Sequence, residues 1–174
     1  MVSPEAEPGP LRLVCFELRA QELALPIGDV RETLPVPPIT RVFLVPPCLA
    51  GVFSLRGDIV PVIDLGILLG LPPTVVGDDS KIVVVDHAAG VVGIVVDRLR
   101  DLRTVETPLE PPPPGLAAEV AALLSGMVAT PTGSVRVLDA RAVLTVEPLR
   151  ALARSETSAD ARPETRPDVE GKMS

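Results

Sequence analysis

The side chains that could carry out covalent chemistry or hold a metal ion are few and far apart in this sequence. His87 is the only histidine, and it falls in a predicted turn directly after Asp86, which ends a predicted strand. A serine–histidine–aspartate arrangement would have to be built on that turn, so we interpret His87 as an exposed turn residue. A zinc site would need Cys15, Cys48, His87 and a carboxylate, and none of these stand at the spacing of zinc ligands. The sequence therefore predicts no catalytic centre, no metal site and no cofactor.

Three short polar or glycine-containing motifs also have simple structural explanations. The glycines of residues 90–93 lie inside a strand pattern and not ahead of a helix, so they do not form a phosphate-binding loop. Asp78 and Asp79 are neighbours in a polar loop, which they solvate. Residues 56–58 spell the cell-adhesion tripeptide Arg-Gly-Asp, but the acidic, proline-rich start of the chain is not a signal peptide. We interpret the tripeptide as a coincidence.

The charge balance and the apolar runs exclude two classes of partner. The formal net charge is −7 and basic residues do not cluster, so we expect no binding to nucleic acid. The longest apolar runs are short and interrupted by proline, glycine or charge, so we expect no membrane insertion. We therefore expect a soluble, cytoplasmic protein in which Cys15 and Cys48 are buried thiols and do not form a disulfide.

The elements that must position any site are predicted to be mainly strands. Val, Leu, Ile, Ala and Pro dominate the apolar residues, and β-branched side chains suit a pleated surface. Short apolar segments bounded by turn signals predict strands at 12–18, 22–27, 30–36, 49–55, 59–64, 81–86, 91–97, 99–105, 126–130 and 135–138. Helical spacing predicts short helices at 65–69, 116–124 and 139–144. These helices are too few to alternate with the strands, so we predict an all-β fold of barrels or a sandwich.

Finer expectations follow from the same patterns. Both ends of the chain are polar and have few apolar residues, which predicts disordered extensions at 1–10 and 151–174 around one domain at 11–150. The connection 39–47 carries four apolar residues, 42–45, outside any predicted strand, and we expect it to cover an edge of the core or to line a binding groove.

Two predictions concern single side chains. Ile94 and Val95 lie on opposite faces of one predicted strand, and we expect both to be buried inside the fold. Asp139 directly precedes the last predicted helix, where its carboxylate can cap the helix N-terminus.

The segment at residues 49–65 resembles the chemotaxis coupling protein family, the CheW-like domains. It reads Leu-Ala-Gly-Val-Phe-Ser-Leu-Arg-Gly-Asp-Ile-Val-Pro-Val-Ile-Asp-Leu, which is similar to a family signature of Gly-Val, Leu-Arg-Gly, an apolar strand with proline, and Asp-Leu. The strands at 16–27 and 92–97, and the prolines, short helix and strand that end near Asp139, agree in order and spacing. Ser54 departs from the family, which usually has asparagine at this position, and so does the scarcity of aromatic residues.

This resemblance implies a fold, a function and a set of contact residues. The implied fold is two intertwined five-stranded SH3-like barrels with an apolar groove between them. The implied function is a non-catalytic adaptor that couples the cytoplasmic tip of a methyl-accepting chemoreceptor to the regulatory domain of a CheA-like histidine kinase. The family's receptor- and kinase-binding residues correspond to Val30, Glu32, Arg56 and Gly57. We hypothesise that Glu32 and Arg56 form a partly buried ion pair beside the groove. Such an adaptor would be cytoplasmic and recruited to membrane-associated receptor arrays.

Other functions remain open at this point. The same groove could bind a small metabolite, which would make the protein a ligand-binding barrel. A kinase fragment or fused regulator is disfavoured, because the chain is too short for a further signalling domain. A hydrolase would have to use His87. A coupling adaptor could also belong to a chemosensory pathway that does not control motility.

Overall fold

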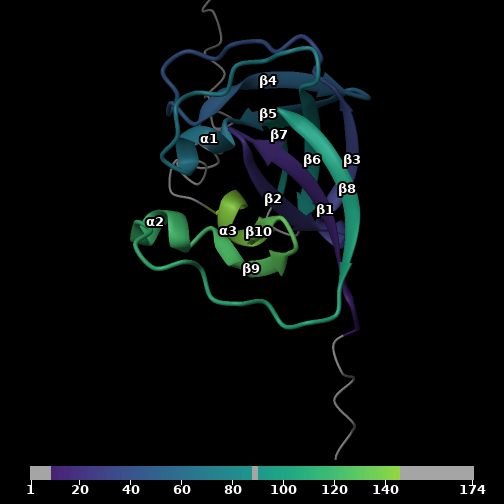
Figure 1. Ribbon diagram of the computed structural model, residues 1–174. Helices are drawn as coiled ribbons and strands as arrows, with labels where there is room; N and C mark the ends of the chain where they lie inside the picture. Colours follow the sequence, from purple (N-terminus) through teal and green to yellow (C-terminus); the bar gives the residue numbers. More distant parts are fainter. Residues whose placement is uncertain (1–8, 88–89, 146–174) are drawn as a thin grey trace, which may run out of the picture.

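The computed structural model describes residues 9–87 and 90–145, and most of these residues lie in strands (Figure 1). The predicted disordered segments 1–10 and 151–174 fall outside the described residues, apart from Gly9 and Pro10. Within the described part of the chain, no helix is long and apolar enough to cross a membrane.

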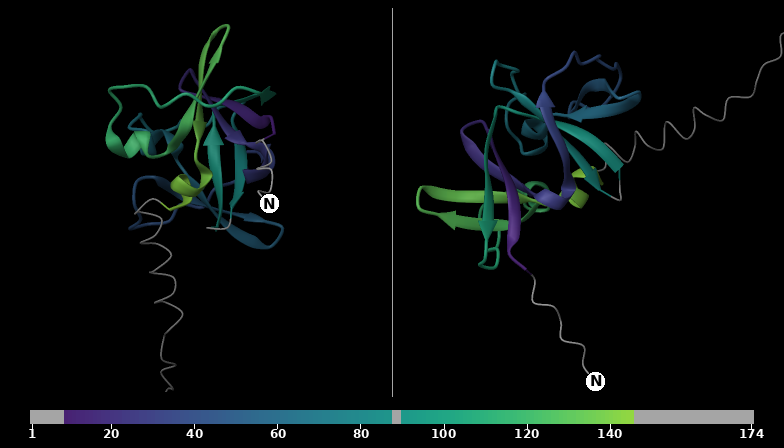
Figure 2. Two further views of the ribbon diagram at one scale, coloured as in Figure 1. Left: turned by 90° about the horizontal axis from the view of Figure 1, so that it is seen from below. Right: turned by 90° about the vertical axis from the view of Figure 1, so that its right-hand side faces the viewer.

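Two five-stranded sheets make up the fold. The first, barrel A, has the strand order β8-β1-β2-β10-β9, and the second, barrel B, has the order β3-β6-β7-β5-β4. The strands of barrel A are β1 (Leu11–Leu18), β2 (Gln21–Pro26), β8 (Arg98–Val105), β9 (Leu124–Thr130) and β10 (Gly133–Leu138). Those of barrel B are β3 (Val30–Pro35), β4 (Leu49–Leu55), β5 (Asp58–Ile63), β6 (Lys81–His87) and β7 (Gly90–Val96). The two sheets lie side by side, with the β9–β10 hairpin projecting from one of them (Figure 2).

The chain passes between the two barrels twice. It leaves barrel A after β2 through the short 3-10 helix η1 (Ile27–Asp29), builds all of barrel B, and returns at Asp97. Each sheet contains one parallel strand pair, which is β2 with β10 in barrel A and β5 with β7 in barrel B. The predicted intertwined arrangement of two five-stranded barrels is therefore confirmed.

Three clusters of buried apolar residues hold the fold together. The interior of barrel A contains Leu13, Cys15, Ala24, Val105, Val128, Val135 and Val137. The interior of barrel B contains Phe53, Val60, Val62, Ile82, Val84 and Val95. A larger cluster joins the barrels and takes Phe16, Leu18, Leu23 and Leu25 from barrel A and Ile63, Val83, Val85, Val92, Ile94 and Val96 from barrel B. Burial of this third cluster fixes the barrels against each other.

Ile94 and Val95 show how one strand serves two of these clusters. Both side chains are buried, as predicted, and successive side chains of a strand point to opposite faces. Ile94 accordingly belongs to the inter-barrel cluster and Val95 to the interior of barrel B.

The hairpins β4–β5 and β9–β10 are structural copies of each other. Each position of the second follows its counterpart by 75 residues, as for Gly51 and Gly126. The two hairpins have the same pattern of buried and exposed residues along both strands. An added Cβ would lie 2.4 Å from the Thr40 carbonyl oxygen at Gly51 and 2.6 Å from the Glu110 carbonyl oxygen at Gly126, so neither position tolerates a side chain. Each barrel therefore contains one copy of the same hairpin unit.

A short helix follows each copy and is capped in the same way. Asp64 precedes α1 (Leu65–Leu68) and accepts a hydrogen bond from the backbone N–H of Ile67. Asp139 precedes α3 (Ala140–Leu144) and accepts from the N–H of Ala142, which confirms the predicted cap.

The structure corrects two local predictions. The helix predicted at 116–124 is a single turn, α2 (Ala118–Ala121), because Leu124 is buried in strand pairing with Leu138 at the start of β9. His87 is not an exposed turn residue but the last residue of β6, where it is half-buried and pairs with Gly90. In both places pairing with the next strand of a hairpin extends a strand beyond the bounds that the local pattern predicts.

Candidate functional site

Glu32 and Arg56, the two charged residues predicted to pair, are in direct contact. Arg56 donates from Nη1 to Glu32 Oε2 at 2.7 Å and from Nη2 to Glu32 Oε1 at 3.3 Å. This two-point contact matches the fork of a guanidinium to the two oxygens of a carboxylate. It connects the tip of the β4–β5 hairpin to the edge strand β3, and the two residues are 24 positions apart in the sequence.

The turn that presents Arg56 depends on its glycine. Arg56 has a φ of 51° and Gly57 a φ of 90°, and two positive φ values in a two-residue turn match the right-handed twist of a hairpin. An added Cβ at Gly57 would meet no neighbour, so glycine is needed for its backbone angle and not for space. Gly57 therefore acts by orienting Arg56.

The ion pair is more exposed than predicted at Arg56. The Glu32 side chain is 22% exposed, and the Arg56 side chain is 70% exposed. The carboxylate is thus half-buried while the guanidinium faces solvent.

Glu32 also lines a groove between the two barrels. The groove has a volume of about 340 Å³ and runs between β3 and β8, which are the edge strands of the two sheets. In Figure 1 these strands lie next to each other. Its apolar lining is Val14, Val30, Leu99 and Leu102, and its polar lining includes Glu32, Thr33, Arg100 and Asp101. The groove surface is therefore mainly apolar, as predicted, with charged side chains among its lining residues.

Val30 belongs both to the groove lining and to the surroundings of the core. It lines the groove and also packs against the inter-barrel cluster, as does Leu99 on the opposite wall. Leu102 is 63% exposed and offers further apolar surface on the β8 side. The structure thus brings together all four predicted contact residues: Val30 and Glu32 lie on one groove wall, and Arg56 and Gly57 on the hairpin tied to it.

The connection 39–47 covers the core only at its start, where Ile39 packs against the interior of barrel B, and it does not line this groove. Phe43 is 85% exposed and Leu44 is fully exposed, and Leu44 has a φ of 60°. The expectation that this segment covers an edge of the core is therefore confirmed for Ile39 but not for Phe43 and Leu44, which point to solvent.

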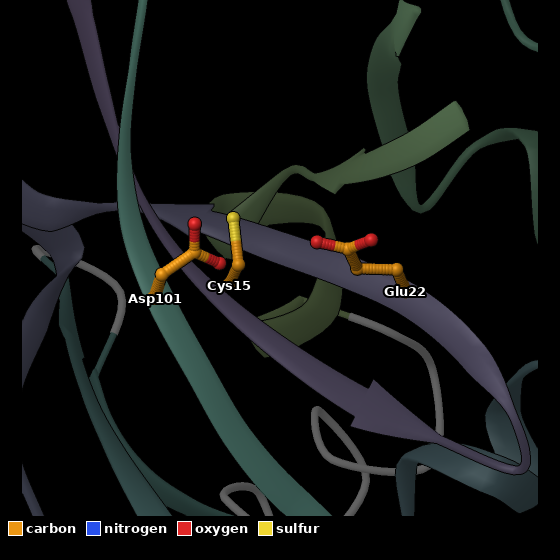
Figure 3. A group of neighbouring side chains, drawn as sticks. All are labelled: Cys15, Glu22 and Asp101. Atoms are coloured by element: carbon orange, nitrogen blue, oxygen red, sulfur yellow. The ribbon is translucent and has the colours of Figure 1, made fainter. Parts of the chain in front are cut away.

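The zinc-ligand set considered from the sequence is not assembled. Among the described residues, the group with metal-ligand side chains close together is Cys15, Glu22 and Asp101 (Figure 3). Arg103 already supplies a cation there, with Nη2 at 3.2 Å from Glu22 Oε1 and 3.5 Å from Asp101 Oδ2. Burial raises the pKa of the Cys15 thiol to about 11, so the sulfur stays protonated and is a poor ligand. These residues form a salt-bridge cluster beside a buried thiol.

Two features of the site were not predicted from the sequence. One is the groove wall formed by β8, whose segment Arg98–Val105 is rich in charge and has an irregular alternation. The other is the repeated hairpin, whose signal was present as Gly51 and Gly126 and as Asp64 and Asp139 at a constant separation. A search for internal repeats at that separation could have found it.

The fold and site define a class of paired SH3-like barrels that present a groove between two edge strands and a charged hairpin beside it. The profile described as the CheW-like domain matches residues 12–147, and the chain belongs to this family. The resemblance seen in the signature segment is thereby confirmed across most of the chain.

Individual relatives agree with this assignment. The chain is 31% identical to "Chemotaxis protein CheW" of Bacillus subtilis over 137 residues, which cover 78% of this chain and 88% of that protein. It is 32% identical to "Chemotaxis protein CheW" of Helicobacter pylori over 108 residues, 62% of this chain and 66% of that protein. Among solved structures, the scaffolding protein TtCheW of Thermoanaerobacter tengcongensis matches with a TM-score of 0.68 and 28% identity, covering 80% of this chain and 90% of that one. The chain is a chemotaxis adaptor of this family, and the ligand-binding and hydrolase alternatives are not favoured.

Proposed function

We propose that this adaptor binds the cytoplasmic tip of a methyl-accepting chemoreceptor and the regulatory domain of a CheA-like histidine kinase. We further propose that Val30, Glu32, Arg56 and Gly57 are contact residues for these partners. The adaptor would then work in the cytoplasm, recruited to membrane-associated receptor arrays.

One observation carries the assignment of the contact residues: Glu32 belongs to the groove and to the ion pair at once. A receptor tip is a helical hairpin, and a helix that docks in a groove needs aliphatic walls such as Val30 and Leu99. Charged residues at the rim then set the orientation of the partner more than its affinity. The exposed guanidinium of Arg56 is in position for that role.

A charge placed in the groove tests the proposal. Val30→Lys should weaken binding of a receptor cytoplasmic fragment or of the kinase regulatory domain, because an ammonium group cannot be buried unpaired against aliphatic walls. Val75→Lys is the matched control, since Val75 is 75% exposed and lies outside the groove. Binding is measured by calorimetry with each purified partner, and folding by circular dichroism.

The outcomes separate the candidate roles of Val30. Weaker binding with an unchanged circular dichroism spectrum supports a contact role for Val30. Equal loss of fold and binding would place Val30 in the core, and unchanged binding to both partners would move the contact surface elsewhere.

A further inference from the structure

The turn between β1 and β2 has a backbone conformation that its residues do not favour by themselves. Arg19 and Ala20 have φ values of 52° and 60°, a region that side-chain-bearing residues seldom adopt. Neither is glycine, asparagine or aspartate, the residues that enter this region most easily. Contacts from outside the hairpin must therefore help to hold the turn in place.

Those contacts come from Asp97, between the two barrels, and from Pro72 of barrel B. The backbone N–H of Arg19 donates to Asp97 Oδ2 at 2.7 Å, and the N–H of Asp97 donates to the Glu17 carbonyl oxygen at 2.9 Å. The Arg19 guanidinium donates from Nη2 to the Pro72 carbonyl oxygen at 3.0 Å. Pro72 lies in the segment that follows α1, so the turn of barrel A is bonded to two separate parts of the chain.

The Arg19 side chain is held in this position even though one of its donors is unsatisfied. Its Nε is buried and has no hydrogen-bond partner. Leaving a buried donor without a partner costs free energy, so the guanidinium is not simply a solvated surface charge.

The position of Asp97 makes these bonds relevant to the groove. Asp97 is the single residue between β7 of barrel B and β8 of barrel A. The strand that begins directly after it forms one groove wall, and β3 of barrel B forms the other. The Arg19–Asp97 bond holds the start of β8 to the β1–β2 turn, and the Arg19–Pro72 bond connects that turn to the segment after α1 in barrel B. Together the two bonds connect the start of the β8 wall to barrel B.

We infer that Arg19 and Asp97 are positioning residues, a clamp that sets the spacing of the groove walls β3 and β8. The importance of this spacing for partners rests on the proposed function. The clamp itself can be measured without any partner.

The direct test measures the distance between the barrels. Spin labels are attached at Ala50→Cys in β4 and Ser125→Cys in β9, two exposed positions that correspond to each other in the repeated hairpin. Cys15 and Cys48 are buried, so they do not compete for the label. Pulsed electron spin resonance should give one narrow distance distribution for the otherwise unaltered protein.

Asp97→Ala should broaden or shift this distribution and should weaken partner binding by at least about fivefold, the low end of couplings between distant sites. Asp78→Ala is the matched control, because Asp78 lies near the clamp but is exposed and makes no side-chain hydrogen bond or ion pair with the described residues. It should leave both the distance and the binding unchanged. A folded Asp97→Ala protein with the original narrow distribution would overturn the inference.

A second variant keeps the test informative if Asp97→Ala does not fold. Arg19→Gly removes the bond to Pro72 while it relieves the unfavourable φ, so this protein should fold and still show a broader distribution. An unchanged distribution in this variant would exclude the side chain from the clamp. If the unaltered protein binds neither partner, the proposed function fails, whereas the distance measurements still decide on the clamp.

Discussion

The Glu32–Arg56 ion pair offers a quantitative test of how the site is built. The perturbation is a double-mutant cycle with Glu32→Gln and Arg56→Gln, which removes each charge and leaves a polar side chain at both positions. An exposed pair contributes roughly 0–1 kcal/mol, whereas removal of one partner from a buried pair costs about 3–5 kcal/mol. Because the Arg56 side chain is 70% exposed, the coupling must be discounted for solvent screening. We expect a coupling of about 0.5–1 kcal/mol, near the upper end for exposed pairs because the contact has two points.

The assay is urea unfolding of the four proteins of the cycle, repeated at high salt. Screening of an exposed pair predicts a smaller coupling at about 1 M salt. The Asp79–Arg98 pair provides a control cycle, because its single contact is longer and both side chains are more than half exposed. Its coupling should lie close to zero.

Two results would refute this reasoning. A coupling above about 2 kcal/mol would mean that the pair is desolvated and that its exposure is misjudged. A coupling of zero in both stability and partner binding would mean that the two residues act separately, with Arg56 contacting a partner alone.

Two further predictions concern the barrel interiors. Val95→Asp should lower the free energy of unfolding in urea by at least about 3 kcal/mol, because Val95 is 4% exposed among apolar residues; a stable variant that loses only partner binding would place this face at an interface. For Cys15, burial raises the pKa to about 11 from 9.0, so the unfolded chain ionises first and stability should fall as the pH rises between these values. Cys15→Ala should lack this part of the decline, and parallel stability-versus-pH curves for the two proteins would contradict the assignment.

Local sequence patterns were enough to locate most strands but not to describe how they pair. The segment 49–55 was predicted with the bounds that the structure shows, because its alternation and the following Arg-Gly turn are local signals. The parallel contacts of β2 with β10 and of β5 with β7 join residues more than 25 positions apart and leave no local pattern. Leu124 was misassigned for a shorter-range reason, because its pairing with Leu138 across the β9–β10 hairpin makes it a strand residue.

The contact residues could be proposed only because the signature segment resembles a known family. Nothing in the composition around Glu32 distinguishes it from the other acidic residues of the chain. Its pairing with Arg56 depends on β3 passing beside the hairpin tip, which is a property of the folded barrel. The β8 wall stayed hidden for a related reason: the apolar alternation of residues 99–105 is imperfect, so the sequence does not show which face of this strand lines a groove.

The repeated hairpin explains why the fold alone does not determine the site. Both barrels contain the same hairpin, with equivalent glycines and equivalent helix caps, yet the two tips differ. At the positions of Arg56 and Gly57, the second copy has Pro131 and Thr132, which carry no charge and cannot form the ion pair. Because the two hairpins have the same backbone arrangement, the difference between their tips must come from selection on side chains or from drift. A contact that exists in one copy and connects the tip to a groove wall is better explained by a requirement for binding than by a requirement for folding, since the second copy folds without it.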